Sequence, residues 1–200
     1  MIRRLLDVTV AACALVVLLP LLIAAAVATR LTAGSGVLFR QRRLGIAGRP
    51  FELLKFRSMR HPSPGREGPE FDADRMTKVG RWLRATSIDE LPSLWNLLRG
   101  EITLVGPRPL PVQYWDRFLG DEYQRFEVRP GITGLAQVNG RNALDWPERL
   151  AFDVDYVRNR TLRGDVRILF ATVPAVFGRS GIEHAAGVTM HALPADRSVG

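Results

Sequence analysis

The hydrophobic pattern of the chain begins with a long apolar run. Residues 8–28 carry no charge, and about 20 such residues are enough for a helix to cross the hydrocarbon core of a bilayer. Pro20 lies in the middle of the run, where it removes a backbone donor and can bend a helix. Arg3 and Arg4 precede the run and many basic residues follow it, so the positive-inside tendency places both flanks on the cytoplasmic side.

Three interpretations of this segment compete. A cleaved signal peptide is the least favoured, because the apolar run is longer than a signal core. A straight transmembrane helix would put one basic flank on the far side of the membrane. A re-entrant helix that turns near Pro20 would keep both flanks in the cytoplasm. The residues by themselves leave the last two interpretations open.

Beyond the apolar run, the pattern predicts an α-rich α+β domain. Short apolar runs at 37–39 and 51–56, on either side of a glycine-containing turn, predict a β-hairpin. Prolines and glycines at 61–70 predict an exposed loop, and a glycine-punctuated loop with a short strand is expected at 129–141. Helices are expected at 76–98, as two helices meeting near Ala85, and at 113–126, 147–159 and 167–177. The last of these suits either the core or a membrane interface.

Composition narrows the class of partner. The chain has 28 Lys and Arg against 20 Asp and Glu, a net charge of +8, which favours an anionic partner. The only cysteine, Cys13, excludes a disulfide framework or a cysteine-based zinc site within one chain. The three histidines (His61, His184 and His191) do not share metal-ligand spacing, and we interpret them as solvated.

Two adjacent carboxylates, Asp89 and Glu90, are the first candidates for chemistry. Ser87 and Glu90 have the spacing of a capping box, which predicts that Asp89 lies in the first turn of a helix. There the helix dipole would help to keep a carboxylate ionised and would attract phosphate. One carboxylate of such a pair can act as a nucleophile while the other holds a metal or moves a proton. Acidic residues at helix starts are common, so the pair alone favours a structural role.

Three arginines are held by neighbours that restrict the backbone. Arg108 lies between two prolines, Arg129 precedes Pro130, and Arg141 follows Gly140. Guanidinium groups match phosphate oxygens bidentately, so the three together suit a diphosphate, although any one of them could simply pair with a carboxylate. Lys55 opens a basic stretch that could face anionic headgroups. Asp153, on a predicted helix, could support a metal or an arginine.

Taken together and in order, these motifs resemble a known family. They are Lys55-Phe56-Arg57-Ser58-Met59, Ser87-Ile88-Asp89-Glu90-Leu91-Pro92, Val105-Gly106-Pro107-Arg108-Pro109, Val128-Arg129-Pro130-Gly131-Ile132-Thr133-Gly134, Gln137-Val138-Asn139-Gly140-Arg141-Asn142 and Asp153-Val154-Asp155-Tyr156-Val157. The resemblance is to the small monotopic phosphoglycosyl transferases of bacteria, the PglC-like members of the bacterial sugar transferase family. It covers nearly the whole chain.

The resemblance implies a reaction and a site. Such enzymes transfer a sugar 1-phosphate from a UDP-sugar to undecaprenyl phosphate and release UMP. By analogy Asp89 would attack the β-phosphorus and form a covalent phosphosugar intermediate, and Glu90 would hold Mg²⁺ and assist proton handling. The substrate-binding residues implied are Lys55, Arg84, Arg108, Arg129, Gln137, Asn139, Arg141 and Asp153.

The resemblance also implies an architecture and a location. The fold would be a monotopic membrane protein at the cytoplasmic face of the bacterial inner membrane, with a re-entrant helix broken near Pro20 and interfacial amphipathic helices. We divide the chain into an anchor (1–30), a cytoplasmic catalytic domain (31–180) and a C-terminal tail (181–200). Anionic membrane lipids and downstream glycosyltransferases are the further partners expected. No nucleic-acid partner is expected, because it would leave the carboxylate pair without a use.

The chain departs from its relatives at a few positions. Leu19 stands before the anchor proline where relatives often carry serine, and Leu150 stands where they often carry phenylalanine. Residues 186–189 resemble the tail of members that use acetamido sugars such as diacetylated bacillosamine. The alternative to catalysis is a membrane-tethered basic protein that binds or scaffolds other components of a glycan pathway.

Overall fold

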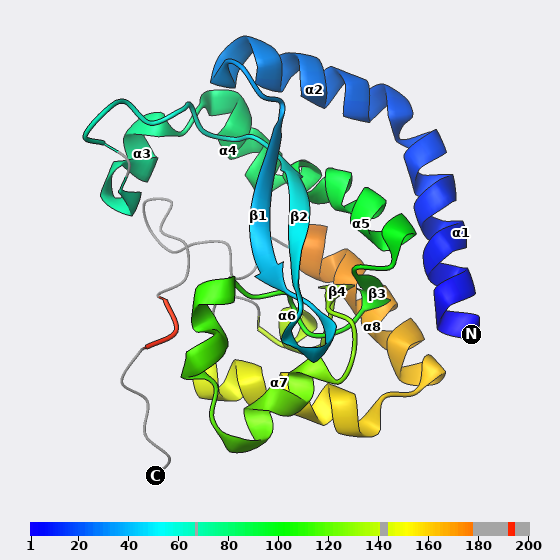
Figure 1. Ribbon diagram of the computed structural model, residues 1–200. Coiled ribbons are helices and arrows are strands. Elements are labelled where there is room, and N and C mark those ends of the chain that lie inside the picture. The colour runs from blue at the N-terminus through cyan, green and yellow to red at the C-terminus, as the bar shows by residue number, and fades with distance from the viewer. Residues whose placement is uncertain (67, 141–143, 178–191, 195–200) are drawn as a thin grey trace.

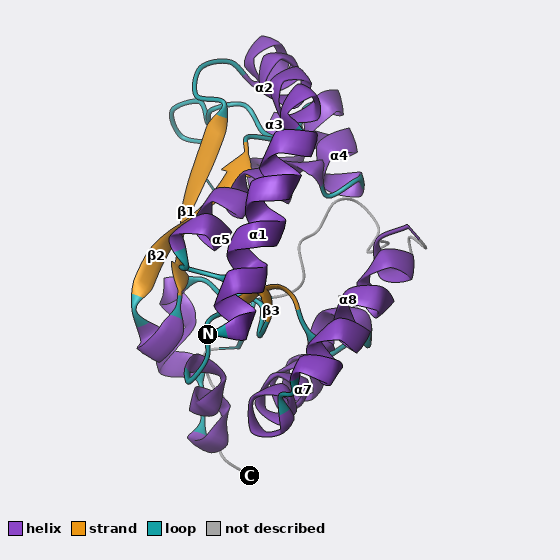
Figure 2. Cartoon of the chain, turned by 90° about the vertical axis from the view of Figure 1, so that its right-hand side faces the viewer, coloured by secondary structure: helices purple, strands orange, loops and turns teal. Residues whose placement is uncertain are grey.

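The computed structural model describes residues 1–66, 68–140, 144–177 and 192–194. It is a helix-rich α+β fold, in which the N-terminal helices α1 (Ile2–Val17) and α2 (Leu19–Ala33) run along one edge of the molecule (Figure 1). Viewed from the side, α1 passes in front of α5 (Leu94–Arg99), while α7 (Trp146–Asn159) and α8 (Leu162–Phe177) lie together on another side (Figure 2).

The predicted break near Pro20 is confirmed. The two helices meet at Leu18 with a bend of 66°. Pro20 lies in the first turn of α2, where a missing N–H breaks no helical hydrogen bond. Among the described residues no single helix has the length and apolarity to cross a membrane, but this bent pair meets both criteria when taken together. Its position in a membrane stays a prediction.

Polar contacts fasten α1 to the rest of the fold. Asp7 is buried and accepts hydrogen bonds from the Thr103 hydroxyl, at 2.9 Å to Oδ2, and from the Leu104 amide, at 2.9 Å to Oδ1. Arg4 donates to the last carbonyls of α5, and Arg3 forms an ion pair with Asp165 of α8 at 2.6 Å. Since a buried carboxylate without partners is costly, these contacts fix the orientation of α1 relative to the strand that begins at Thr103.

Two small sheets connect the helices. Strands β1 (Leu38–Leu44) and β2 (Pro50–Phe56) pair antiparallel around the short 3₁₀ turn η1 (Ile46–Gly48), which confirms the predicted hairpin. Strands β3 (Thr103–Val105) and β4 (Gly131–Thr133) pair in parallel. A Cβ atom on Gly131 would lie 2.1 Å from the Gly106 nitrogen, so glycine is required where these two segments meet.

The helices between the two sheets differ in part from the prediction. After η2 (Pro69–Phe71) and α3 (Asp72–Arg75), helix α4 (Lys78–Ala85) ends at Ala85 as expected. The predicted capping box is wrong: Ser87 has a φ of 58° and its side chain caps nothing, and η3 (Ile88–Ser93) is a 3₁₀ helix. Pro92 explains the difference, because it lacks the N–H that an α-helix starting at Ile88 needs and its ring would clash with the preceding turn.

The expected α-helix over 113–126 is also replaced by 3₁₀ structure. The segments η4 (Val112–Arg117) and η5 (Gly120–Phe126) are separated by the extended residues Phe118 and Leu119. This interruption lets Phe118 and Phe126 enter the same core, with ring centroids 5.0 Å apart. The short α6 (Leu135–Val138) follows β4. Helices α7 and α8 confirm the last two predicted helices, with α8 beginning earlier than expected.

The core beneath η4 and η5 contains a residue from the C-terminal tail, a segment for which the sequence predicts no structure. Leu193 is fully buried in a cluster with Leu44, Leu110, Phe118, Phe126 and Leu150. The Leu193 carbonyl accepts a hydrogen bond from Arg117. Leu150, the position where relatives often carry phenylalanine, is therefore a packing residue. The tail contributes to the same core as the hairpin and the turn after Val105.

We expect Leu193→Ala to lower the free energy of unfolding by about 2–4 kcal/mol, because it leaves a cavity in this cluster. Denaturant unfolding of the purified protein measures this change. Leu193→Met, which nearly conserves volume, should cost less than about 1.5 kcal/mol. An unchanged unfolding midpoint for the alanine variant would show that the tail does not support the core.

Candidate active site

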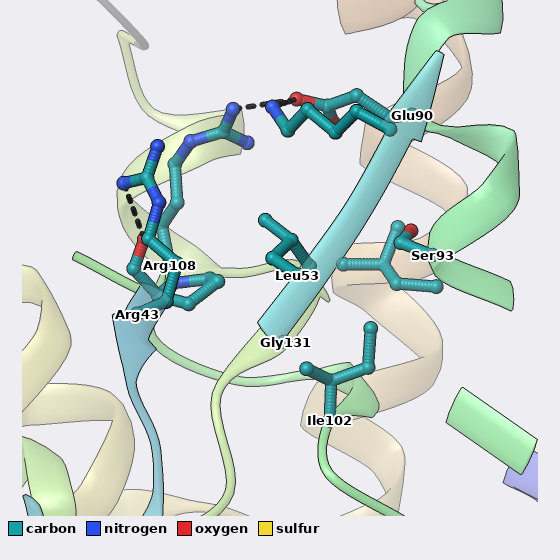
Figure 3. A pocket seen from close by; sticks show the side chains of 10 residues that line it. Arg43, Leu53, Glu90, Ser93, Ile102, Arg108 and Gly131 are labelled. Atoms are coloured by element: carbon teal, nitrogen blue, oxygen red, sulfur yellow. Dashed lines mark hydrogen bonds and ion pairs between the residues drawn. The ribbon is translucent and has the colours of Figure 1, made fainter. Parts of the chain in front are cut away.

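The two candidate carboxylates lie on η3, where β2 and the turn after β3 approach it. The Glu90 carboxylate accepts hydrogen bonds from Lys55 Nζ and from Arg108 Nη2, each at 2.7 Å and both at the same oxygen, Oε1. Lys55 comes from β2, and Arg108 from the Gly106–Pro109 turn. Figure 3 shows Glu90 and Arg108 joined across the top of the pocket. Three separate segments of the chain thus meet at one carboxylate.

The two cations determine the charge state of Glu90. Burial opposes ionisation of this carboxyl, but the charges of Arg108 and Lys55 and their hydrogen bonds hold its pKa well below the ordinary value. Glu90 in turn raises the pKa of Arg108. Burial lowers the pKa of Lys55 despite the attraction of Glu90. A carboxylate held ionised in this way carries a fixed negative charge at neutral pH, and the proton handling expected for Glu90 stays a prediction.

Asp89 has the opposite character. The residue is only 8% exposed, and burial together with the neighbouring charge of Glu90 raises the pKa of its carboxyl to about 6. The charges of Lys55, Arg84 and Arg108 pull that pKa down, but not enough to restore it. The sequence predicts a carboxylate kept ionised by a helix dipole. Burial and the adjacent charge of Glu90 instead make Asp89 a carboxylate that is costly to ionise.

Arg84 lies on α4 at the side of this site. Its Nε donates to the Ser58 hydroxyl at 2.9 Å, and Ser58 follows β2. Helix α4 can approach Ser58 because residue 80 is glycine: a Cβ there would lie 1.9 Å from the Ser58 carbonyl oxygen. Arg84 therefore has a fixed position near Asp89 without an ion pair of its own among the described residues.

Asp153 lies behind the site, not in it. Its carboxylate accepts from Arg125 Nη2 at 2.8 Å, and both side chains are 2% exposed. Arg125 also donates to the Arg108 carbonyl at 2.8 Å. Of the two partners that the sequence allowed for Asp153, a metal or an arginine, the structure has the arginine. The buried pair supports the backbone of Arg108.

Three other predicted substrate-binding residues lie near β4 and α6. Arg129 is exposed just before β4. Gln137 donates to the Ile132 carbonyl at 3.1 Å, and its buried Oε1 has no partner among the described residues. Asn139 is exposed and donates to the Leu135 carbonyl at 2.8 Å. Arg141 lies outside the described residues. The structure thus brings Lys55, Glu90 and Arg108 into direct contact, and Arg129, Gln137 and Asn139 take no part in that contact.

Arg43 is a site residue that the sequence did not indicate. It lines one pocket with Lys55, Glu90 and Arg108, over an apolar base that includes Leu53, Ile102 and Ile132 (Figure 3). The signal that could have found it is strand alternation. Two adjacent arginines in a strand must point to opposite faces, and Arg42 is exposed while Arg43 is half-buried.

The carboxylate pair fits a magnesium ion that shares its coordination with a substrate. No group of three or more His, Cys, Asp or Glu side chains suited to a metal is found in the described ranges. Mg²⁺ nevertheless commonly binds through one or two carboxylates and substrate phosphates, without a dedicated protein cage. Asp89 and Glu90 are adjacent, and both ion pairs of Glu90 use only Oε1. The donor set is therefore suited to a metal that arrives with a phosphorylated ligand.

Comparisons with known proteins agree with this chemistry. The model of the family described as bacterial sugar transferase matches residues 1–179. The uncharacterized sugar transferase EpsL of Bacillus subtilis is 42% identical, over 94% of this chain and 93% of its own length. The UDP-glucose:undecaprenyl-phosphate glucose-1-phosphate transferase of Caulobacter vibrioides is 43% identical, over 87% of this chain and 69% of its own.

Some relatives are much longer than this chain. The UDP-galactose-lipid carrier transferase of Erwinia amylovora is 42% identical over 74% of this chain, but the match covers 35% of that protein. The family model matches residues 1–179, a range that contains both the bent helix pair and the carboxylate site of this chain. The chain belongs to the bacterial sugar transferase family and is a phosphoglycosyl transferase.

Proposed function

We propose that this protein transfers a sugar 1-phosphate from a UDP-sugar to undecaprenyl phosphate and releases UMP, with Asp89 as the nucleophile. The observation that carries the proposal is a buried carboxylate with a raised pKa, adjacent to a second carboxylate that is held by two cations. The names of relatives that act on UDP-glucose and undecaprenyl phosphate support the choice of substrates.

In the first step a carboxylate oxygen of Asp89 attacks the β-phosphorus of the UDP-sugar. The new bond joins Asp89 to the sugar phosphate, and the bond from the β-phosphorus to the bridging oxygen breaks, so that UMP leaves with the electron pair. Repulsion between Asp89 and the diphosphate opposes the attack. The cationic groups of Lys55, Arg84 and Arg108, whose charges act on Asp89, offset this repulsion.

In the second step a phosphate oxygen of undecaprenyl phosphate attacks the same phosphorus. The bond to Asp89 breaks and the carboxylate is regenerated, which gives undecaprenyl diphosphosugar. The acyl phosphate is activated for this displacement because a carboxylate is a good leaving group. Arg125 and Asp153 keep the Arg108 backbone in place during both steps.

The cofactor proposed is Mg²⁺, held by Glu90 and the phosphates of the donor. When bound, the ion would supply positive charge to the diphosphate and to the leaving UMP. The contribution of the chain itself is to keep Glu90 ionised and oriented through Lys55 and Arg108.

We also propose that α1 and α2 form a re-entrant anchor at the cytoplasmic face of the inner membrane. Large apolar side chains on this pair are exposed, including Val17 and Leu31 at 75% and 80%. Phe170 of α8 is 74% exposed, which suits an interfacial helix. An anchor of this kind brings a soluble nucleotide sugar and a membrane-bound acceptor to the same site. Anionic lipids would be attracted by the net charge of +8.

The names of relatives and the sequence of the C-terminal tail point to different donor sugars. Relatives are named for glucose and galactose, whereas the pattern at 186–189, which lies outside the described residues, resembles members that use acetamido sugars. A donor panel should therefore contain UDP-glucose, UDP-galactose and N-acetylated UDP-sugars, including UDP-diacetylbacillosamine. Downstream glycosyltransferases would consume the product.

The decisive experiment is UMP release by the purified protein in lipid, with Mg²⁺, undecaprenyl phosphate and this panel. We expect UMP from one or two donors only, and loss of turnover in Asp89→Asn. In the absence of acceptor, wild-type protein should gain the mass of one phosphosugar and the variant should not. Release of UDP instead of UMP, or full turnover by the variant, would contradict the proposal. A non-catalytic scaffold would keep its cellular function in the Asp89→Asn variant.

We expect Asp89→Asn to stabilise the metal-free protein above pH 6. The native pKa of Asp89 is raised from 3.8 to about 6, so above pH 6 the native state carries a penalty for ionising Asp89 that the unfolded state does not. The gain should be about 1–3 kcal/mol and should fade as the pH falls from 6 to 4.

Unfolding in a chelating buffer across this pH range measures the effect. Glu90→Gln is the matched control, and it should destabilise the protein at neutral pH because it leaves Lys55 and Arg108 without their shared carboxylate. A stability loss in Asp89→Asn of the same size would show that Asp89 is not strained by burial.

Removal of Mg²⁺ by a chelator should reduce UMP release by at least about 100-fold, since a diphosphate beside two carboxylates then lacks its counter-ion. Circular dichroism should be unchanged, because no cluster suited to a structural metal exists in the part of the chain that the structure describes. Activity should return when Mg²⁺ is added in excess. Undiminished turnover in the chelator would remove the metal from the proposal.

A further inference from the structure

Arg43 has an environment unlike that of the other cations in the pocket. Its Nη1 donates to the Pro109 carbonyl at 3.0 Å and its Nη2 to the Gln41 side chain at 2.6 Å. Both acceptors are neutral. Within the described ranges no carboxylate forms an ion pair with Arg43, whereas Lys55 and Arg108 both contact Glu90. The guanidinium is thus held in place by neutral acceptors, and the negative charge of Glu90 acts on it without a direct ion pair.

A second observation is an unused donor. The Nε atom of Arg43 is buried and has no hydrogen-bond partner among the described residues. A buried N–H without an acceptor costs free energy comparable to a lost hydrogen bond. The two terminal nitrogens hold the guanidinium in a fixed orientation, so this donor can be satisfied by an acceptor that enters the pocket.

A third observation is the proximity of Arg108. Figure 3 shows the side chains of Arg43 and Arg108 lying together on one side of the pocket. Burial, and next the positive charge of Arg108, lower the pKa of Arg43 to about 10. Among the residues that line the pocket, three cations face the single carboxylate of Glu90. An anion that binds between the Arg43 and Arg108 guanidinium groups would offset the repulsion between their positive charges.

We propose that Arg43 forms a phosphate-binding subsite of this pocket, in which its guanidinium binds a phosphate oxygen of a substrate. The proposal rests on the reaction proposed above, and it adds a residue to the site that the family motifs did not include. A phosphate oxygen matches the planar array of guanidinium donors and supplies the missing negative charge. The phosphate could belong to the diphosphate of the donor or to the polyprenyl phosphate acceptor, and the experiment separates these two sources.

The test compares Arg43→Gln with Arg42→Gln. The two variants lose the same charge from adjacent positions of β1, but Arg42 is exposed and lies on the other face of the strand. Arg43→Lys keeps the charge and loses the planar donors. Gln41→Met keeps the guanidinium but removes one of the acceptors that orient it. Thermal unfolding of each variant identifies any that fail to fold.

Two readouts are measured for each variant. The first is the affinity for UDP and for UMP, obtained by calorimetry in Mg²⁺ buffer. The second is the KM for the UDP-sugar and for undecaprenyl phosphate, obtained from UMP release. A donor subsite predicts that Arg43→Gln weakens UDP binding and raises the donor KM by at least about tenfold. An acceptor subsite predicts the same increase in the KM for undecaprenyl phosphate alone.

For a subsite of either kind, Arg42→Gln should change these constants less than about twofold, with Arg43→Lys and Gln41→Met intermediate. A folded Arg43→Gln protein with unchanged affinities and KM values overturns the proposal. A fall in kcat alone does so too, because it indicates that Arg43 only positions the Pro109 carbonyl. If wild-type protein releases no UMP from any donor, the proposed function fails, while weaker UDP binding by Arg43→Gln than by Arg42→Gln would still support a phosphate subsite at Arg43.

Discussion

The arrangement of the site depends on one carboxylate oxygen that accepts from two cations. Lys55 comes from β2 and Arg108 from the turn after β3, and without Glu90 between them these two positive charges would repel. A partly buried ion pair of this kind contributes little net stability, because the desolvation of its charges offsets most of the attraction. The ion pairs matter for geometry, because they hold the hairpin, η3 and the Gly106–Pro109 turn in fixed positions relative to one another. The contacts among Lys55, Glu90 and Arg108 therefore position charge in the site more than they stabilise the fold.

This positioning determines the state of Asp89. The same cations that hold Glu90 ionised act on Asp89 from farther away, and burial outweighs them, so the pKa of Asp89 remains raised. The pKa values of the two adjacent carboxyls are shifted in opposite directions. Glu90 therefore keeps a fixed negative charge, whereas the protonation of Asp89 can respond to a ligand. A phosphorylated ligand that brings a metal would favour the ionised form of Asp89. In the site without a ligand, the raised pKa of about 6 means that Asp89 gains a proton at a higher pH than an ordinary aspartate does.

The sequence predicted the elements whose patterns are local and missed those that depend on tertiary contacts. The bend near Pro20, the hairpin, and the helix ending at Ala85 follow from proline, turn and periodicity signals. The capping-box spacing at Ser87 was misleading because Pro92, four residues after Ile88, forbids the α-helical hydrogen bond. Asp153 has the motif of a site residue but lies behind Arg108, and only the contact with Arg125 shows this. Leu193 has no local signal, since its burial depends on residues far away in the chain.

The N-terminal helices directly contact the segments that carry the site residues. Ala25 of α2 packs in one cluster with Phe56 and Leu83, and Leu22 and Ile88 lie against it. Phe56 follows Lys55 in the chain and Ile88 precedes Asp89, so the helix that follows the break contacts the neighbours of both site residues. On the other side of the break, Asp7 binds the strand that leads to the turn carrying Arg108. Because close-packed contacts and buried hydrogen bonds transmit position rigidly, the depth of the bent pair in a bilayer would fix the distance from the membrane surface to Asp89. A lipid-linked acceptor phosphate would thus meet Asp89 at a height determined by the fold, with no separate hinge required between anchor and site.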